Sequence, residues 1–241
     1  MDDLEDQDEP DPWWRRLGTG AAINIATGLY FSASLALQEL SALPLEVQTV
    51  REVTLSVLRP FLVMCSGQHQ DLVGPPPTLE GYWRIAGAKS GEFFGIACRA
   101  GARLASDQAD ILAGFHQFGF NFGLLLQVLD DLKDFQDLSQ GEQTVDVRTL
   151  SRSLPAVYVR EVCPVPVRER FDQYLSRADT DPNAVAILTQ IIEENGGTLY
   201  LLMELEKYRD LALAGLDVAE VKGQPRQALV AMLDQLYSPL S

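Results

Sequence analysis

Three aspartates, Asp130, Asp131 and Asp134, follow a largely apolar run from Ile111 to Leu129. A run of this length indicates a helix, because strands seldom exceed about ten residues. On a helix, carboxylates four residues apart lie about 5–6 Å from each other on one face. Like charges at that distance repel unless a cation lies between them, and oxygen ligands at this spacing suit a hard ion such as Mg²⁺. The stretch is interpreted either as half of a metal site or as a solvated acidic helix end.

The same spacing of aspartates occurs at the start of the sequence, in Asp2, Asp3 and Asp6. A terminus so rich in acid is usually a disordered tail, and we expect residues 1–12 to be poorly ordered. However, each stretch reads DDxxD, and two such stretches in one helical chain favour a pair of metal-binding motifs over chance.

The candidate groups for binding phosphate are one lysine and two neighbouring arginines. Lys89 lies among small residues in the segment 87–91, and small neighbours let a ligand approach closely. Its alternative interpretation is a solvated or snorkelling lysine. Arg15 and Arg16 follow a pair of tryptophans, and they either bind an anion or pair with the acids nearby.

Composition limits the classes of function. The chain has 241 residues, of which 46% are hydrophobic, so it is long enough to bury a full core. A net charge of -15 argues against a nucleic acid or an anionic membrane as partner, whereas a phosphate substrate is compatible with metal ions held by carboxylates. Cys65, Cys98 and Cys163 are far apart and suggest reduced thiols. The acidic start is no signal peptide, and polar residues interrupt the apolar runs, so we expect a cytoplasmic protein without stable membrane insertion.

The elements that must position these residues are predicted to be helices. Only residues 145–149 show a weak strand pattern, so the fold is predicted to be all-α, with a single domain over residues 1–241. Pro60 is expected to kink the second long helix. The predicted helices are 21–40, 45–72, 82–104 after a cap at Thr78, 107–135, 155–162, 166–177, 182–195, 198–218 and 225–237.

Taken in order, these residues resemble the trans-prenyltransferases of the polyprenyl synthetase family, which includes farnesyl and geranylgeranyl diphosphate synthases. The resemblance covers Asp2 to about Tyr158. It rests on both aspartate-rich motifs, on Gln127 before the second one, on Gly67-Gln68 with Asp71-Leu72, on Lys89-Ser90, and on Arg152-Ser153-Leu154-Pro155.

The resemblance implies an isoprenoid synthase-type helical bundle around a central cavity, with Mg²⁺ as cofactor. It assigns the metal to Asp2, Asp3, Asp6, Asp130, Asp131 and Asp134. It assigns substrate binding to Arg15, Arg16, Gln68, Lys89, Gln127 and Arg152, with catalytic roles for Lys89, Gln127 and Asp130.

The activity that the resemblance implies is the condensation of isopentenyl diphosphate with an allylic diphosphate to give a polyprenyl diphosphate. A cytoplasmic homodimer is expected, with the nearly uncharged helix 21–40 as the suspected interface. The family's helices before the first motif are expected to be missing here, which keeps open a non-catalytic partner subunit of a prenyl synthase. A class I terpene cyclase is the other alternative, although cyclases usually carry a second motif of the type Asn-Asp-x-x-Ser-x-x-x-Glu.

Overall fold

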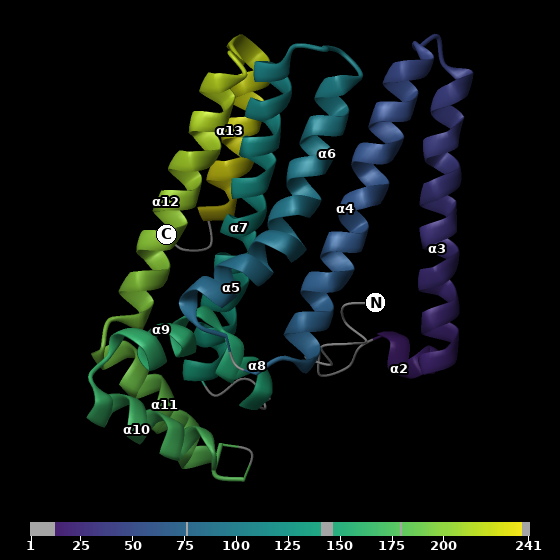
Figure 1. Cartoon of the computed structure of the whole chain (residues 1–241). Helices are drawn as coiled ribbons and strands as arrows, with labels where there is room; N and C mark the ends of the chain where they lie inside the picture. Colours follow the sequence, from purple (N-terminus) through teal and green to yellow (C-terminus); the bar gives the residue numbers. More distant parts are fainter. Residues whose placement is uncertain (1–12, 76, 141–146, 179, 238–241) are drawn as a thin grey trace. The chain divides into compact units, whose positions relative to one another are not determined.

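The computed structural model describes residues 13–75, 77–140, 147–178 and 180–237 (Figure 1). Within these ranges every regular element is a helix, which confirms the predicted all-α fold. The elements are α2 (Trp13–Leu17), α3 (Thr19–Glu39), η1 (Leu40–Ala42), α4 (Val47–Val73), α5 (Leu79–Ala86), η2 (Gly87–Gly91), α6 (Glu92–Arg103), α7 (Ala109–Gln140), α8 (Val147–Arg152), α9 (Leu154–Val162), α10 (Val165–Leu175), α11 (Pro182–Glu194), α12 (Gly197–Val218) and α13 (Gly223–Tyr237).

Most helix boundaries agree with the predictions, although α7 ends at Gln140 and not at residue 135, and further local features differ. The Thr78 side chain accepts a hydrogen bond from the Gly81 N–H at 3.1 Å, so the predicted helix cap is confirmed. The helix predicted over 82–104 is instead two α-helices joined by the π-helical turn η2. Residues 147–149 begin the helix α8, so the weak strand pattern was wrong for that part. Helix α4 continues through Pro60.

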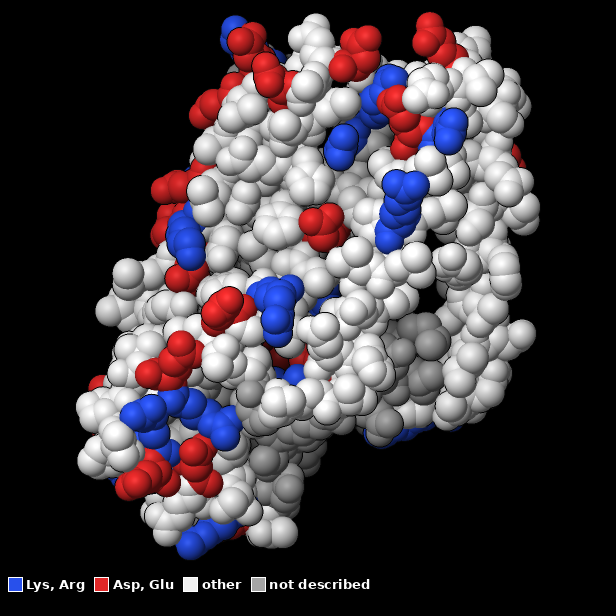
Figure 2. All heavy atoms as spheres, viewed as in Figure 1, with Lys and Arg blue, Asp and Glu red and all other residues white. Residues whose placement is uncertain are grey.

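The chain forms two compact units, Met1–Leu58 and Arg59–Ser241. In the first unit, α3 has Ala22 as its one buried residue. The small and apolar residues of segment 21–40, which carries almost no charge, predict a helix packed on most sides, and this prediction is wrong within the unit. The surface of α3 is almost free of charge (Figure 2).

Two helical segments, 19–42 and 109–139, are long and apolar enough to cross a membrane by length and composition. The second segment belongs to α7 and is half buried among other helices of the chain. Core helices of soluble proteins meet the same criteria, so this finding does not establish a membrane span.

Helix α7 is the centre of the second unit, where it packs against α6 and α12 (Figure 1). Glycines on α7 allow these close contacts. A Cβ atom at Gly119 would lie 2.2 Å from the Phe94 carbonyl oxygen of α6, and one at Gly114 would lie 2.5 Å from the Gly215 carbonyl oxygen of α12. Helices at this distance can hold side chains of α7 in a fixed position relative to both neighbours.

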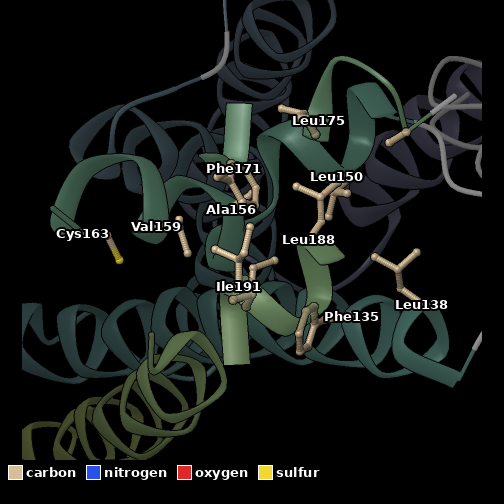
Figure 3. Packing of buried hydrophobic residues seen from close by; sticks show 12 residues of the cluster. Phe135, Leu138, Leu150, Ala156, Val159, Cys163, Phe171, Leu175, Leu188 and Ile191 are labelled. Carbon is tan, nitrogen blue, oxygen red and sulfur yellow. The ribbon is translucent and has the colours of Figure 1, made fainter. Parts of the chain in front are cut away.

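The acidic end of α7 is anchored by an apolar cluster that joins it to α8, α9, α10 and α11 (Figure 3). Phe135 and Leu138 of α7 contribute to this cluster, and Phe171, Leu188 and Ile192 are among its fully buried members. Burial of each such side chain stabilises the fold by about 1.5–3 kcal/mol. The second aspartate motif therefore sits on a well-packed part of the helix.

Candidate functional site

The second aspartate motif divides into exposed and buried residues. Asp130 and Asp134 of α7 are exposed, while Asp131 is only 8% exposed. The Oδ2 atom of Asp131 accepts one hydrogen bond from the Tyr82 hydroxyl and another from the Leu154 backbone N–H, both at 2.7 Å. Asp130 and Asp134, one helical turn apart, are the two carboxylates of this motif that face solvent.

Burial controls the protonation of Asp131. Removal from water raises the pKa of this carboxyl to about 7, although the hydrogen bonds from Leu154 and Tyr82 oppose the shift, and the charges of Asp134 and Asp130 add to it. The same burial, together with the Asp131 charge, raises the pKa of the Tyr82 hydroxyl well above its usual value. Tyr82 therefore remains a hydrogen-bond donor throughout the physiological pH range.

A second cluster, which we call the cation cluster, consists of Asp71, Lys89 and Arg152. The Asp71 carboxylate accepts from Lys89 Nζ at 3.0 Å and from Arg152 Nε at 2.9 Å. The Arg152 guanidinium also donates to the Gly74 carbonyl at 2.8 Å and to the Gln70 carbonyl at 3.3 Å. One aspartate at the end of α4 thus holds two cations that lie far apart in the sequence.

The two cations of the cluster determine the protonation of Asp71. Burial alone would raise the pKa of this carboxyl, but the charges of Lys89 and Arg152 and their hydrogen bonds outweigh it, so the pKa lies below its usual value. Asp71 is therefore ionised at neutral pH. The side chains of Lys89 and Arg152 are 18% and 11% exposed, so the alternative of a freely solvated Lys89 is wrong.

The π-helical turn η2 places Lys89 and Ser90. A Cβ atom at Gly123 of α7 would lie 2.2 Å from the Ser90 carbonyl oxygen, and one at Gly67 of α4 would lie 2.9 Å from the Ala88 Cβ. The absence of side chains at these glycines lets η2 approach both helices closely. From this position the Ser90 hydroxyl donates to Oε1 of Gln127 at 3.0 Å. Short π-helical turns occur frequently at functional sites.

The structure brings some of the predicted site residues together. Lys89 and Arg152 meet at Asp71, and Gln127 is bound to Ser90, the residue after Lys89. Gln68 is half-buried on α4, near the end that carries Asp71. These residues all belong to the second unit.

The other predicted site residues belong to α2 in the first unit or lie outside the described residues. Arg15 and Arg16 are exposed on α2 of the first unit, and the Arg15 guanidinium lies 5.5 Å from the centre of the Trp14 ring. The first aspartate motif, Asp2, Asp3 and Asp6, lies outside the described residues.

The described residues contain no group of three or more His, Cys, Asp or Glu side chains arranged to hold a metal ion. The donor chemistry of the second motif nevertheless fits Mg²⁺ at Asp130 and Asp134, which are exposed oxygen donors one turn apart. It does not fit at Asp131, because this carboxyl is buried and its Oδ2 atom already accepts hydrogen bonds from two neutral donors.

Sequence reasoning missed Tyr82 and the importance of Asp71. Tyr82 entered only as the first residue of a predicted helix, and no spacing rule links it to Asp131 on another helix. Asp71 entered as part of a short motif with Leu72. The sequence offers one signal for this role: Asp71 belongs to the same set of motifs as the cations Lys89 and Arg152, and a carboxylate that is partly buried needs such partners.

Comparison with known proteins identifies the family and agrees with this fold. A family profile described as polyprenyl synthetase matches residues 1–193, and the chain belongs to that family. The chain is 32% identical over 122 residues to a geranylgeranyl diphosphate synthase of Mycobacterium tuberculosis, a match that covers 49% of this chain and 34% of the relative.

Two further comparisons extend the match. A probable mitochondrial hexaprenyl pyrophosphate synthase of Yarrowia lipolytica is 26% identical over 158 residues, which cover 63% of this chain and 33% of the relative. The matches thus span about a third of the length of these curated relatives. The crystal structure of geranylgeranyl pyrophosphate synthetase from Pyrococcus horikoshii superposes with a TM-score of 0.78 at 19% identity, covering 98% of this chain and 74% of that one. This likeness shows the isoprenoid synthase fold.

Proposed function

We propose that this protein is a prenyltransferase that joins isopentenyl diphosphate to an allylic diphosphate and releases pyrophosphate. The observation that carries the proposal is the cation cluster. Lys89 and Arg152 are two half-buried cations from separate helices, and both are held by one carboxylate, Asp71. Within the polyprenyl synthetase family, this arrangement suits the recognition of a diphosphate.

The cation cluster would bind a diphosphate by exchange of hydrogen-bond partners. Lys89 offers a point charge with three donors, and the guanidinium of Arg152 offers a planar fork. Asp71 keeps both groups oriented before the ligand arrives, which reduces the loss of side-chain freedom on binding. The phosphate oxygens then accept hydrogen bonds that the cations now give in part to Asp71.

Asp130 and Asp134 are the residues of this motif that we propose as Mg²⁺ ligands, together with Asp2, Asp3 and Asp6. Bound Mg²⁺ supplies positive charge that stabilises the departing pyrophosphate. Gln127 lies on α7, as these aspartates do, and the Ser90 hydroxyl of η2 donates to its side-chain oxygen. We propose that the side-chain NH₂ group of Gln127 contacts the substrate. Arg15, Arg16 and Gln68 remain proposed substrate-binding residues.

We also propose a cytoplasmic homodimer. Helix α3 exposes Leu29, Phe31 and Leu35, each at least 60% accessible, and Glu39 at its end is its one charged residue. Exposed apolar surface of this extent favours a protein interface. A charged substitution such as Leu35→Glu is expected to shift the sedimentation of the purified protein from dimer to monomer.

The proposed activity is tested with the purified full chain, isopentenyl diphosphate, a set of allylic diphosphates and Mg²⁺. We expect a longer prenyl diphosphate to form, with a rate that falls by about 100-fold or more in Asp130→Ala. Glu193→Ala is the matched control, because Glu193 is an exposed helical carboxylate on α11. Removal of Mg²⁺ with a chelator should abolish the reaction.

The same assay separates the alternatives. A cyclic or simply dephosphorylated product from the allylic substrate alone would indicate a class I terpene cyclase. No product from either substrate, combined with unchanged activity of a partner synthase in the presence of Asp130→Ala, would indicate a non-catalytic subunit. Either result would overturn the proposed function.

A further inference from the structure

The DDxxD pattern treats its three aspartates alike, but their surroundings differ. Asp130 and Asp134 are exposed, whereas Asp131 points into the protein and is 8% exposed. A metal ligand must present a free lone pair toward the ion, and magnesium retains waters that need space. The buried position of Asp131 therefore requires a different explanation.

The first partner of Asp131 connects α7 to α5. The Tyr82 hydroxyl donates to Oδ2 at 2.7 Å, and Tyr82 is itself 7% exposed within the apolar cluster that contains Leu132 and Leu154. A hydrogen bond in such surroundings is both strong and costly to leave unmade. It fixes the rotation of α5 relative to α7.

The second partner connects α7 to the start of α9. The Leu154 N–H is an orphan donor at the first turn of this helix, and the side chain of the preceding Ser153 makes no capping hydrogen bond. Ser153 instead donates to the Leu150 carbonyl at 2.9 Å. Asp131 accepts the Leu154 N–H at 2.7 Å, so a carboxylate from α7 caps α9 in place of a local residue.

Both partners belong to segments that carry the cation cluster. Tyr82 lies on α5, which continues directly into the turn η2 with Lys89. Leu154 follows Arg152 by two positions. Asp131 thus ties the helix of Asp130 and Asp134 to the two segments that supply Lys89 and Arg152.

We propose that Asp131 is a positioning residue and not a metal ligand: its carboxylate holds α5 and α9 against α7 and so places Lys89 and Arg152 relative to Asp130 and Asp134. The proposal rests on the proposed function, because it concerns the site where a diphosphate and its metal ions bind. It assigns the three aspartates of one motif to two different tasks.

The test for a ligand role compares Asp131→Asn with Asp130→Asn and Asp134→Asn. Binding of Mn²⁺ in the presence of inorganic pyrophosphate is measured by electron paramagnetic resonance on the full chain. We expect Asp131→Asn to bind Mn²⁺ within about 3-fold of the wild type, because the asparagine oxygen still accepts from Tyr82 and Leu154. Asp130→Asn should weaken binding by about 10-fold or more. A loss in Asp131→Asn as large as that in Asp130→Asn would overturn the proposal.

The test for a positioning role uses Tyr82→Phe, which removes one hydrogen bond and keeps the ring in the core. Its matched control is Tyr208→Phe, since both tyrosines are 7% exposed in the same apolar cluster. Calorimetric titration with inorganic pyrophosphate and Mn²⁺ should show about 3- to 10-fold weaker binding for Tyr82→Phe, and no change for Tyr208→Phe. Equal affinities for Tyr82→Phe and the wild type would contradict the positioning role.

Failure of the proposed function gives a different result. If Asp130→Asn, Asp134→Asn and Asp131→Asn all bind Mn²⁺ and pyrophosphate as the wild type does, the metal site of the proposed function is wrong. The positioning role then still stands or falls with the tyrosine pair, because neither Tyr82 nor Tyr208 is a proposed metal ligand.

Discussion

Asp71 is half-buried and Asp131 is buried, and the carboxyl group of each accepts two hydrogen bonds from other segments of the chain. The pKa values of the two groups nevertheless shift in opposite directions. The partners of Asp71 are the cations Lys89 and Arg152, and its pKa lies below the usual value. The partners of Asp131 are the neutral Tyr82 hydroxyl and a backbone N–H, and its pKa is raised to about 7. Burial acts in the same direction on both carboxyls, so formal positive charge, and not the number of hydrogen bonds, reverses its effect.

The largest expected loss of stability follows removal of the Asp131 carboxyl, which accepts hydrogen bonds from two neutral donors. Asp131→Ala leaves the Tyr82 hydroxyl and the Leu154 N–H without their acceptor, and each unsatisfied buried donor costs about 1–3 kcal/mol. We expect the free energy of unfolding to fall by about 2–5 kcal/mol, measured by urea denaturation. Lys133→Ala, an exposed change on the same helix, should stay within about 0.5 kcal/mol. Equal effects of the two substitutions would contradict the buried geometry.

A smaller loss is expected when the shared anion of the cation cluster is removed. Asp71→Ala leaves Lys89 and Arg152 as neighbouring like charges, but all three side chains retain some contact with water, which lowers the penalty. The free energy of unfolding should fall by about 1–3 kcal/mol. Asp172→Ala, which breaks the exposed ion pair with Arg160, should cost less than about 1 kcal/mol. An Asp71 variant no less stable than the Asp172 variant would show that the cluster is solvated.

The contribution of Asp71 to the free energy of unfolding should depend on pH. Because its folded-state pKa is lower than the ordinary value of 3.8, its ionised form stabilises the fold at a pH above that value, and this contribution is lost as the pH falls through the folded-state pKa. The difference in unfolding free energy between the wild type and Asp71→Asn should be complete near pH 6 and should shrink below about pH 4. Denaturation curves over this range measure it. A constant difference would contradict the charge-based explanation.

The smallest expected effect is a change in the pKa of Asp71 when Lys89 alone is replaced. Lys89→Met removes a positive charge of the cluster while it keeps an apolar side chain of similar length, so burial is opposed only by Arg152. The pKa of Asp71 should then rise, as followed by NMR of its side-chain carboxyl carbon. Lys222→Met, on an exposed residue, serves as the control. An unchanged Asp71 pKa in the Lys89 variant would show that Arg152 alone determines it.

Sequence patterns predicted the helices and the shared helix face of Asp130 and Asp134, because both depend on local spacing. The apolar run before Asp130 indicated α7, and the capping role of Thr78 followed from its residue type and position. Spacing also placed Asp130 and Asp134 on one face. These predictions needed no knowledge of the neighbouring helices.

The burial of Asp131 depends on neighbouring helices, about which the aspartate pattern contains no information. The partners of Asp131 come from α5 and α9, so its environment could not be read from its own segment. The same limit explains the error at α3, where an apolar composition predicted burial and the structure shows exposure. Composition gives the preference of a helix for burial and does not supply its partner.

The π-helical turn at Gly87–Gly91 has a consequence for chain length. Such a turn carries one residue more than an α-helical turn, so a one-residue deletion inside it can join α5 to α6 as a continuous α-helix and keep the face of α6 toward α7. A deletion within α6 instead rotates all later residues of that helix by about 100°. The turn is therefore the point in this helix at which the sequence can shorten by one residue and keep the core, while Lys89 loses its place beside Asp71.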